Sequence, residues 1–138
     1  MKRVISVFLA VIILTAILAI PASARASNQI ASYSIGIVPQ GSGKVQVTVN
    51  VNGTHRNMTR IGFPSIALYE RVNSGGSWSP VFSTGPHYNP NATAGSHTYT
   101  FTYQGVAGRQ YYSYSTFFAR DADGSDTRGA SSPIITAT

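Results

Sequence analysis

The sequence predicts an all-β domain of antiparallel strands, preceded by a short N-terminal targeting segment. The chain has 138 residues, which is about the length of one domain. After residue 25, no stretch shows the apolar spacing of a helix, whereas apolar and polar residues alternate with a period of two in several short runs. Gly- and Pro-rich segments separate these runs, as turns do between neighbouring strands.

The N-terminal segment has the pattern of a secretory signal helix. Lys2 and Arg3 precede an apolar run over residues 4–20, and Pro21 ends it before the small residues Ala22-Ser23-Ala24. We expect cleavage after Ala24, which divides the chain into a signal peptide (1–24) and one secreted β-sandwich domain (25–138). The apolar run is also just long enough to remain as a membrane anchor. The small residues favour cleavage, so we expect membrane contact only through the signal peptide.

Seven strands are expected in the mature chain. In residues 44–51, four valines alternate with polar side chains, and residues 97–103 repeat the pattern with aromatic rings. Such residues suit a pleated surface, and the alternation predicts sheets with one solvated face. Pro133 interrupts the last run, which should therefore lie at a sheet edge or start after a break. The seven runs are residues 30–38, 44–52, 65–71, 78–84, 96–103, 109–120 and 127–136.

Seven strands in about 100 residues are typical of an immunoglobulin-like sandwich. Residues 106–124 comprise an apolar residue, a turn, tyrosines, an alternating strand and a Gly-containing hairpin loop. This order resembles the later half of a fibronectin type III domain, and residues 131–134 resemble the start of its last strand. The likeness covers roughly residues 96–138 and is shared by small secreted bacterial domains. It implies a fibronectin type III-like sandwich.

The resemblance also implies a tyrosine corner, in which a tyrosine hydroxyl bonds to the backbone just upstream. Val106 and Tyr112 have the family's spacing, so Tyr112 is the first candidate and Tyr111 the second. The first half of the chain departs from the family. The tryptophan usual in the second strand is absent, and Val47 or Val49 stands in its place.

The composition argues against catalysis. Charged residues make up 10% of the chain, compared with about 25% in typical globular proteins. Three of the four acids lie within residues 121–126, so a pair of well-placed catalytic carboxylates is not evident. The absence of cysteine excludes thiol nucleophiles and cysteine-bound metals. No Gly-x-Ser-x-Gly elbow is present. We expect a protein that is not an enzyme and that needs no cofactor.

Three connections should meet at one end of the sandwich, because connections between antiparallel strands alternate between the two ends. We call this end, formed by residues 53–64, 85–95 and 121–126, the loop pole. Two of its loops are long, and long loops in compact domains are often functional. Its candidate binding residues are His55, Arg56, Arg60, His87, Tyr88, Asp121, Asp123 and Asp126. The alternative is that these charges neutralise one another and the loops only connect strands.

Metal sites have little support in the sequence. Asp121, Asp123 and Asp126 are weak calcium candidates, because calcium prefers several carboxylate oxygens. The position of Gly124 does not fit an EF-hand, and Asp-Gly is a strong hairpin signal, so a turn is preferred. His55, His87 and His97 show no spacing typical of metal ligands.

Aromatic residues raise the question of sugar binding, because flat rings stack on sugar rings. Those in the expected strands are assigned to the core: Tyr99, Phe101, Tyr103, Tyr112, Tyr114 and Phe118. For Trp78, a place in the core or at its rim is preferred over exposure. Tyr88 is the ring expected to face solvent.

The partner expected from charge is anionic. Loss of Lys2 and Arg3 lowers the net charge from +6 to +4, which favours acidic polymers and salt-sensitive binding. The basic residues are scattered, so nucleic acid is not expected. We therefore expect a monomeric, secreted, non-catalytic binding module for anionic cell-surface polymers, glycans or a protein. The alternative is a structural subunit that assembles by β-strand addition, through an exposed edge strand or residues 25–29.

Overall fold

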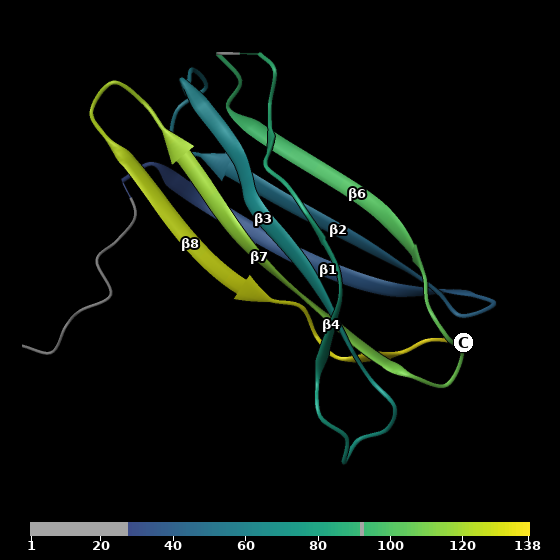
Figure 1. The fold of residues 1–138 in the computed structure, drawn as a ribbon. Coiled ribbons are helices and arrows are strands. Elements are labelled where there is room, and N and C mark those ends of the chain that lie inside the picture. The colour runs from purple at the N-terminus through teal and green to yellow at the C-terminus, as the bar shows by residue number, and fades with distance from the viewer. Residues whose placement is uncertain (1–27, 92) are drawn as a thin grey trace, which may run out of the picture.

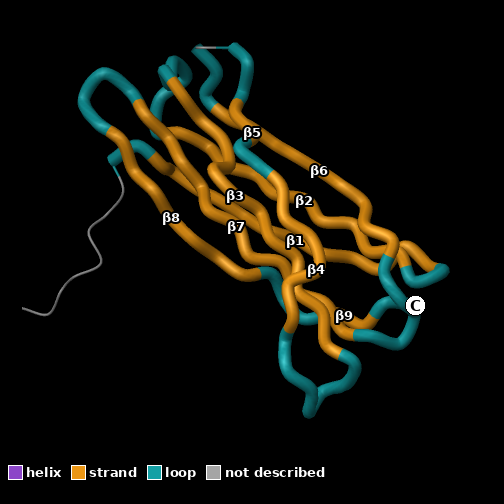
Figure 2. Tube along the Cα trace, viewed as in Figure 1, coloured by secondary structure: helices purple, strands orange, loops and turns teal. Residues whose placement is uncertain are grey.

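The computed structural model describes residues 28–91 and 93–138. The predicted signal peptide and its cleavage site at Ala24 lie outside these residues. The described residues form an all-β structure of antiparallel strands with no helix (Figures 1 and 2). Accordingly, they contain no helix that could cross a membrane.

Two sheets make up the sandwich. The first has the order β1-β2-β6, and the second has the order β4-β3-β7-β8, with β5 paired to β3 and β9 paired to β7. We call them sheet A and sheet B. The strands are β1 (Ile30–Gly41), β2 (Lys44–Gly53), β3 (Arg60–Arg71), β4 (Ser79–Thr84), β5 (His87–Tyr88), β6 (Ser96–Gln104), β7 (Gln110–Arg120), β8 (Ser125–Ser131) and β9 (Ile135–Thr136).

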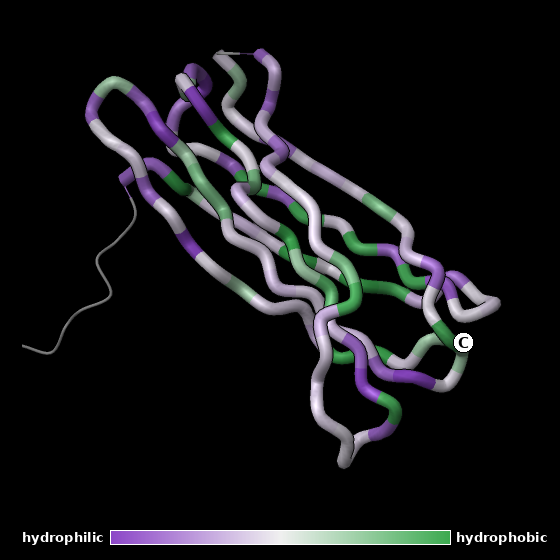
Figure 3. Tube along the Cα trace, viewed as in Figure 1, coloured by the Kyte–Doolittle hydropathy of each residue, from purple (hydrophilic) through white to green (hydrophobic). Residues whose placement is uncertain are grey.

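Sheet A follows the alternation in its sequence. The four valines of β2 are fully buried: Val45, Val47, Val49 and Val51. Their partners on β6 include Tyr99, Phe101 and Tyr103, which pack against the core as predicted. Figure 3 shows hydrophobic residues alternating with polar ones along the strands, and hydrophilic residues in the loops at the upper end.

The aromatic residues of β7 divide between the two faces of sheet B. Tyr111 and Phe117 are fully buried, whereas Tyr112 and Phe118 are half-buried and Tyr114 is exposed on the outer face. The prediction that these last three belong to the core is therefore wrong. Aromatic residues occur in adjacent pairs in this strand, so either face could be apolar, and small serines occupy the buried positions between the inner rings.

The described residues form nine strands, whereas seven were predicted. The last strand was predicted as one run over residues 127–136, but it divides into β8 and β9, with Pro133 between them. Strand β3 begins at Arg60 rather than Ser65, because a register shift between Gly62 and Ser65 accommodates Pro64 within the strand.

The extra strand β5 lies in the predicted loop 85–95. It pairs with β3 through Gly62 and Phe63. A Cβ atom on Gly62 would lie 2.7 Å from the Cα atom of Tyr88, so only glycine permits this approach.

A buried tyrosine joins β7 to β3 at the end opposite the loops. The Tyr111 hydroxyl accepts a hydrogen bond from the Val106 amide (2.9 Å) and donates one to the Glu70 carboxylate. Arg109 donates to the other Glu70 oxygen at 2.5 Å. The preference for Tyr112 at this corner is therefore wrong, since Tyr111 makes the bond to the upstream backbone. Burial and the bond to Glu70 raise the pKa of Tyr111 to about 12.

This corner predicts an alkaline loss of stability. In the unfolded chain the pKa of a tyrosine is about 10. The raised pKa therefore stabilises the fold below pH 10, and this stabilisation is lost as the pH rises from about 10 to about 12. Urea unfolding at a series of pH values should measure this loss. Between pH 10 and 12, the free energy of unfolding should fall about 2 to 3 kcal/mol more in the native chain than in Tyr111→Phe. Equal pH slopes for the two proteins would contradict the role of this hydroxyl.

Candidate functional site

The three predicted loops lie together at one end of the sandwich (Figure 1). The Gly53 amide donates to the Gly95 carbonyl at 2.8 Å, which joins the first loop to the second. The Thr59 amide donates to the Arg120 carbonyl at 2.8 Å, which joins the first loop to the end of β7. Side chains of the first loop and the acidic hairpin also meet, since His55 Nε2 lies 3.9 Å from Asp121 Oδ2. The loop pole is therefore one continuous surface.

The acidic residues of the pole bind the chain's own backbone. Asp121 Oδ1 accepts from the amides of Asp123 and Gly124, which closes the β7–β8 hairpin. Asp126 Oδ2 accepts from the amides of Asn28 and Gln29, at 2.7 and 3.0 Å. Of the three calcium candidates, Asp121 therefore closes the hairpin and Asp126 holds the start of the described chain. The third, Asp123, has an exposed side chain. Among residues 28–91 and 93–138, no three His, Asp or Glu side chains lie close enough to hold a metal ion.

Two arginines lie side by side on the outer face of sheet B. Arg60 and Arg120 are opposite one another in the β3–β7 register, and both are exposed. The Arg60 guanidinium lies 3.9 Å from the centre of the Tyr88 ring, and the Arg120 guanidinium lies 5.5 Å from that of Phe118. Within the described part of the chain, no carboxylate forms a salt bridge with either one. We call Arg60 and Arg120 the arginine pair.

The pair concentrates positive charge at a rigid position. Like charges directly opposite each other in a sheet destabilise it. Stacking on aromatic faces offsets part of this cost and holds each guanidinium plane. The two rings also contact each other, with centroids 6.0 Å apart and planes at 78°. The arrangement can therefore hold the oxygens of a carboxylate, sulfate or phosphate in the fork geometry that arginine favours.

The remaining predicted residues have different surroundings. Arg56 is exposed in the first loop. His87 is half-buried, because its ring stacks on Tyr99 with centroids 3.8 Å apart and its Nε2 lies 2.7 Å from the Thr84 hydroxyl. The neighbouring His97 is half-buried too, and burial together with the charge of His87 lowers the pKa of His97. His87 therefore packs between the sheets, whereas its neighbour Tyr88 faces outward, and its ring contacts the Arg60 guanidinium.

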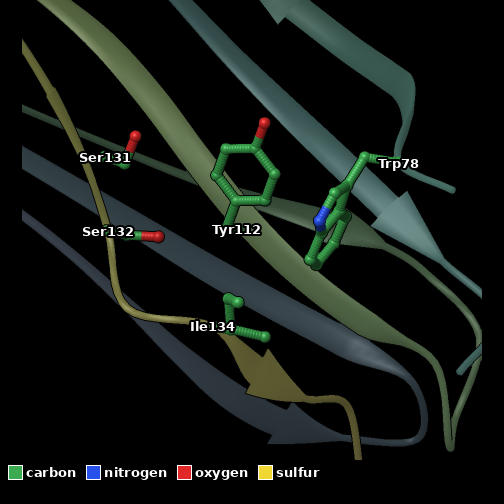
Figure 4. Close-up of a pocket in the computed structure, with 5 residues that line it drawn as sticks. All are labelled: Trp78, Tyr112, Ser131, Ser132 and Ile134. Atoms are coloured by element: carbon green, nitrogen blue, oxygen red, sulfur yellow. The ribbon is translucent and has the colours of Figure 1, made fainter. Parts of the chain in front are cut away.

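A hollow lies on sheet B, away from the loop pole. It has a volume of about 320 Å³ and is lined by Trp78, Tyr112, Ser131, Ser132 and Ile134 (Figure 4). We call it the aromatic groove. The Trp78 ring stands edge-on to Tyr112, with centroids 4.6 Å apart and planes at 87°. Beside it, Tyr69 stacks on Tyr112 at 4.9 Å with planes 7° apart.

Sequence reasoning missed this groove because Tyr112 was assigned to the core and Trp78 to the core or its rim. A signal was nevertheless present in β3. Ile66 and Leu68 identify the inner face of this strand, so Tyr69 and Arg71 must face outward. An outward-facing tyrosine on the same face as an arginine could have marked the surface. What the strand alone could not show was that Tyr112 lies directly opposite Tyr69.

The chain matches no protein-family model and no curated protein.

The acidic hairpin makes a testable prediction about metal and stability. Asp126→Ala removes an acceptor that serves two backbone amides, so we expect the free energy of unfolding to fall by about 1 to 3 kcal/mol. Asp123→Ala, at an exposed side chain, is the matched control and should change it little. Thermal unfolding of the native chain with and without millimolar calcium should give the same midpoint. A midpoint raised by calcium would contradict the structural role of these acids.

Proposed function

We propose that the protein is a secreted, non-catalytic binding module that holds an anionic extracellular polymer at its loop pole. The observation that carries the proposal is the arginine pair. Two exposed guanidiniums lie on one face, opposite one another, and no described carboxylate pairs with them. Of the acids that were the alternative partners of these arginines, Asp121 and Asp126 instead accept hydrogen bonds from the backbone.

The shape of the pole suits a polymer better than a small molecule. The arginine pair lies on an exposed sheet face, beside Tyr88 and near the loop that carries Arg56 and His55. An extended polyanion can contact several of these groups at once, and each contact adds to affinity. Such binding weakens with salt, because exposed charges are screened.

The immunoglobulin-like, fibronectin type III-like class is part of the same proposal. Two antiparallel sheets, the hydrogen bond from Val106 to Tyr111 and the sequence resemblance over residues 96–138 support it. Domains of this class commonly bind ligands through loops clustered at one end. A secreted location is supported by the N-terminal sequence pattern.

The arginine pair can be tested with heparin as a polyanion probe. Arg60→Ala/Arg120→Ala should weaken binding tenfold or more, because each lost charge-assisted bond contributes about 1.5 kcal/mol or more. Arg60→Lys/Arg120→Lys keeps the charge but loses the planar fork, so we expect an intermediate affinity. For single variants, Lys44→Ala is a charge-matched control for Arg60→Ala and should cost less. If Arg60→Ala and Lys44→Ala lose the same affinity for heparin, binding follows net charge alone, and this would refute a specific site at the arginine pair.

A second candidate function is a structural subunit, and strand β1 favours it. This strand runs for 12 residues, pairs with β2 alone among the described strands and contains no charged side chain. Edge strands usually carry charges that prevent pairing with other chains. Strand β1 lacks this protection and could add to a strand of a second copy.

Size-exclusion chromatography of residues 25–138 over a range of concentrations separates the two candidates. A binding module should elute as a monomer throughout. Assembly through β1 should give larger species as concentration rises, and Ser34→Lys, which places a charge on the strand, should remove them. Larger species that persist in Ser34→Lys would contradict assembly through this edge.

A further inference from the structure

We propose that the aromatic groove is a second binding site and that its ligand is an acidic sugar, a pyranose ring that carries a carboxylate. The groove and the arginine pair lie at opposite ends of the β3–β7 pair, since Tyr69 is opposite Tyr112 and Arg60 is opposite Arg120. The two sites use different residues. The inference therefore goes beyond the polyanion site and does not depend on it.

The rings of Trp78 and Tyr112 stand at right angles to each other in the groove, and another side chain covers one face of each ring. Figure 4 shows Tyr112 between Trp78 on one side and Ser131 and Ser132 on the other, with Ile134 below. Such walls contact the C–H face of a flat, saturated ring while its hydroxyls remain at the edges. A volume of about 320 Å³ is within the range of small-ligand sites.

One wall of the groove is held in place by hydrogen bonds. The Ser132 hydroxyl accepts from the Ser113 amide at 2.9 Å and donates to the Pro133 carbonyl at 2.8 Å. These two bonds fix the segment that contains Ser131 and Ile134. Ile134 itself is 52% exposed. A site formed before the ligand arrives loses less entropy on binding.

Polar groups suited to sugar hydroxyls surround the rings. The groove-lining side chains include the Ser131 and Tyr112 hydroxyls and the Trp78 indole nitrogen, which is a donor only. Sites for small ligands commonly combine aromatic walls with a few such groups. Pyranose rings present hydroxyls that can both donate and accept, so they match this mixture.

An exposed tyrosine extends the groove along β7. Tyr114 is 42% exposed, and its ring lies across the backbone of Gly129 on β8. A Cβ atom at Gly129 would lie 2.9 Å from Tyr114 Cζ, so the absence of a side chain there leaves room for the hydroxyl end of Tyr114. Ser131, which lines the groove, is opposite Tyr114 in the register. The exposed ring of Tyr114 can therefore contact the next sugar of a chain.

The charge at the groove favours an acidic sugar over a neutral one. The Arg71 guanidinium lies 4.4 Å from the centre of the Trp78 ring, and its Nε donates to Gln110 at 2.8 Å. These contacts hold the guanidinium at the rim. The adjacent Glu70 lies on the other face of β3 and is bound to Arg109 and Tyr111. Among the described residues, no carboxylate pairs with Arg71, so a ligand carboxylate can do so.

A proline-rich peptide is the other occupant that aromatic grooves accept. Its rings would pack on Trp78 and Tyr112, but a neutral peptide would leave Arg71 without an anion. The charge therefore favours the acidic sugar, and the peptide is a competing outcome of the test.

The chain has a single tryptophan, so its fluorescence reports on the groove directly. We would titrate residues 25–138 with a tetramer of galacturonic acid, with its methyl-esterified form and with a proline-rich peptide. The acid should give a saturable change in Trp78 emission, and the ester, which keeps the rings but lacks the charge, should bind at least tenfold more weakly. Arg71→Gln should remove the difference between acid and ester.

Two variants test the walls, and one serves as a control. Tyr112→Ser should abolish the change in Trp78 emission. Ile134→Ser, at an exposed side chain, should weaken this change, and it provides the test if Tyr112→Ser fails to fold. Arg60→Ala/Arg120→Ala should show the same change in Trp78 emission with the acidic sugar as the native chain does. This result does not depend on whether heparin binds at the arginine pair, so the two proposals can fail separately. The proposal is overturned if neither sugar changes the emission, if only the peptide does, or if the preference for acid persists in Arg71→Gln.

Discussion

The register between β3 and β7 determines where the side chains of the two proposed binding surfaces lie. It places Arg60 opposite Arg120 at one end of sheet B and Tyr69 opposite Tyr112 at the other. Both pairs face outward only because β3 changes its alternation between Gly62 and Ser65. Before this shift, Ile61 and Phe63 face the core, and after it Ile66 and Leu68 do. A bulge that changes the direction of side chains is a known way to direct residues toward a site.

Contacts on both faces of sheet B hold this register at the groove end. On the inner side, Tyr111 and Arg109 bind Glu70, and on the outer side Arg71 binds Gln110. Of these anchoring residues, Arg71 also contacts Trp78 and so lies at the rim of the aromatic groove. At the pole, the backbone bond from Thr59 to Arg120 and the pairing of β5 with β3 have the corresponding role. Binding surfaces on such a frame need little rearrangement to accept a ligand.

Sequence patterns predicted some elements well and others poorly, for physical reasons. Strands β2 and β6 alternate between polar and apolar residues, so one face could be assigned to the core and the structure confirms it. In β7 the adjacent Tyr111 and Tyr112 are equally apolar, and only the packing partner of each ring decides between the faces. Strand β5 has two residues and depends on the close approach allowed by Gly62, which no local pattern reports. The meeting of the three loops followed from strand alternation, whereas the bonding of the acids to backbone amides required coordinates.

Both proposed binding surfaces depend on the β3–β7 register, which a disulfide can test in this cysteine-free chain. The hydroxyls of Ser65 and Thr116 lie 3.1 Å apart on the outer face, so cysteines at these positions should be within reach of each other. We predict that Ser65→Cys/Thr116→Cys oxidises to an intramolecular disulfide and that Ser65→Cys/Ser115→Cys, whose second position faces the core, does not. Non-reducing electrophoresis and mass spectrometry distinguish these products. A disulfide in the second protein and none in the first would show a register shifted by one residue and contradict the placement of both binding surfaces.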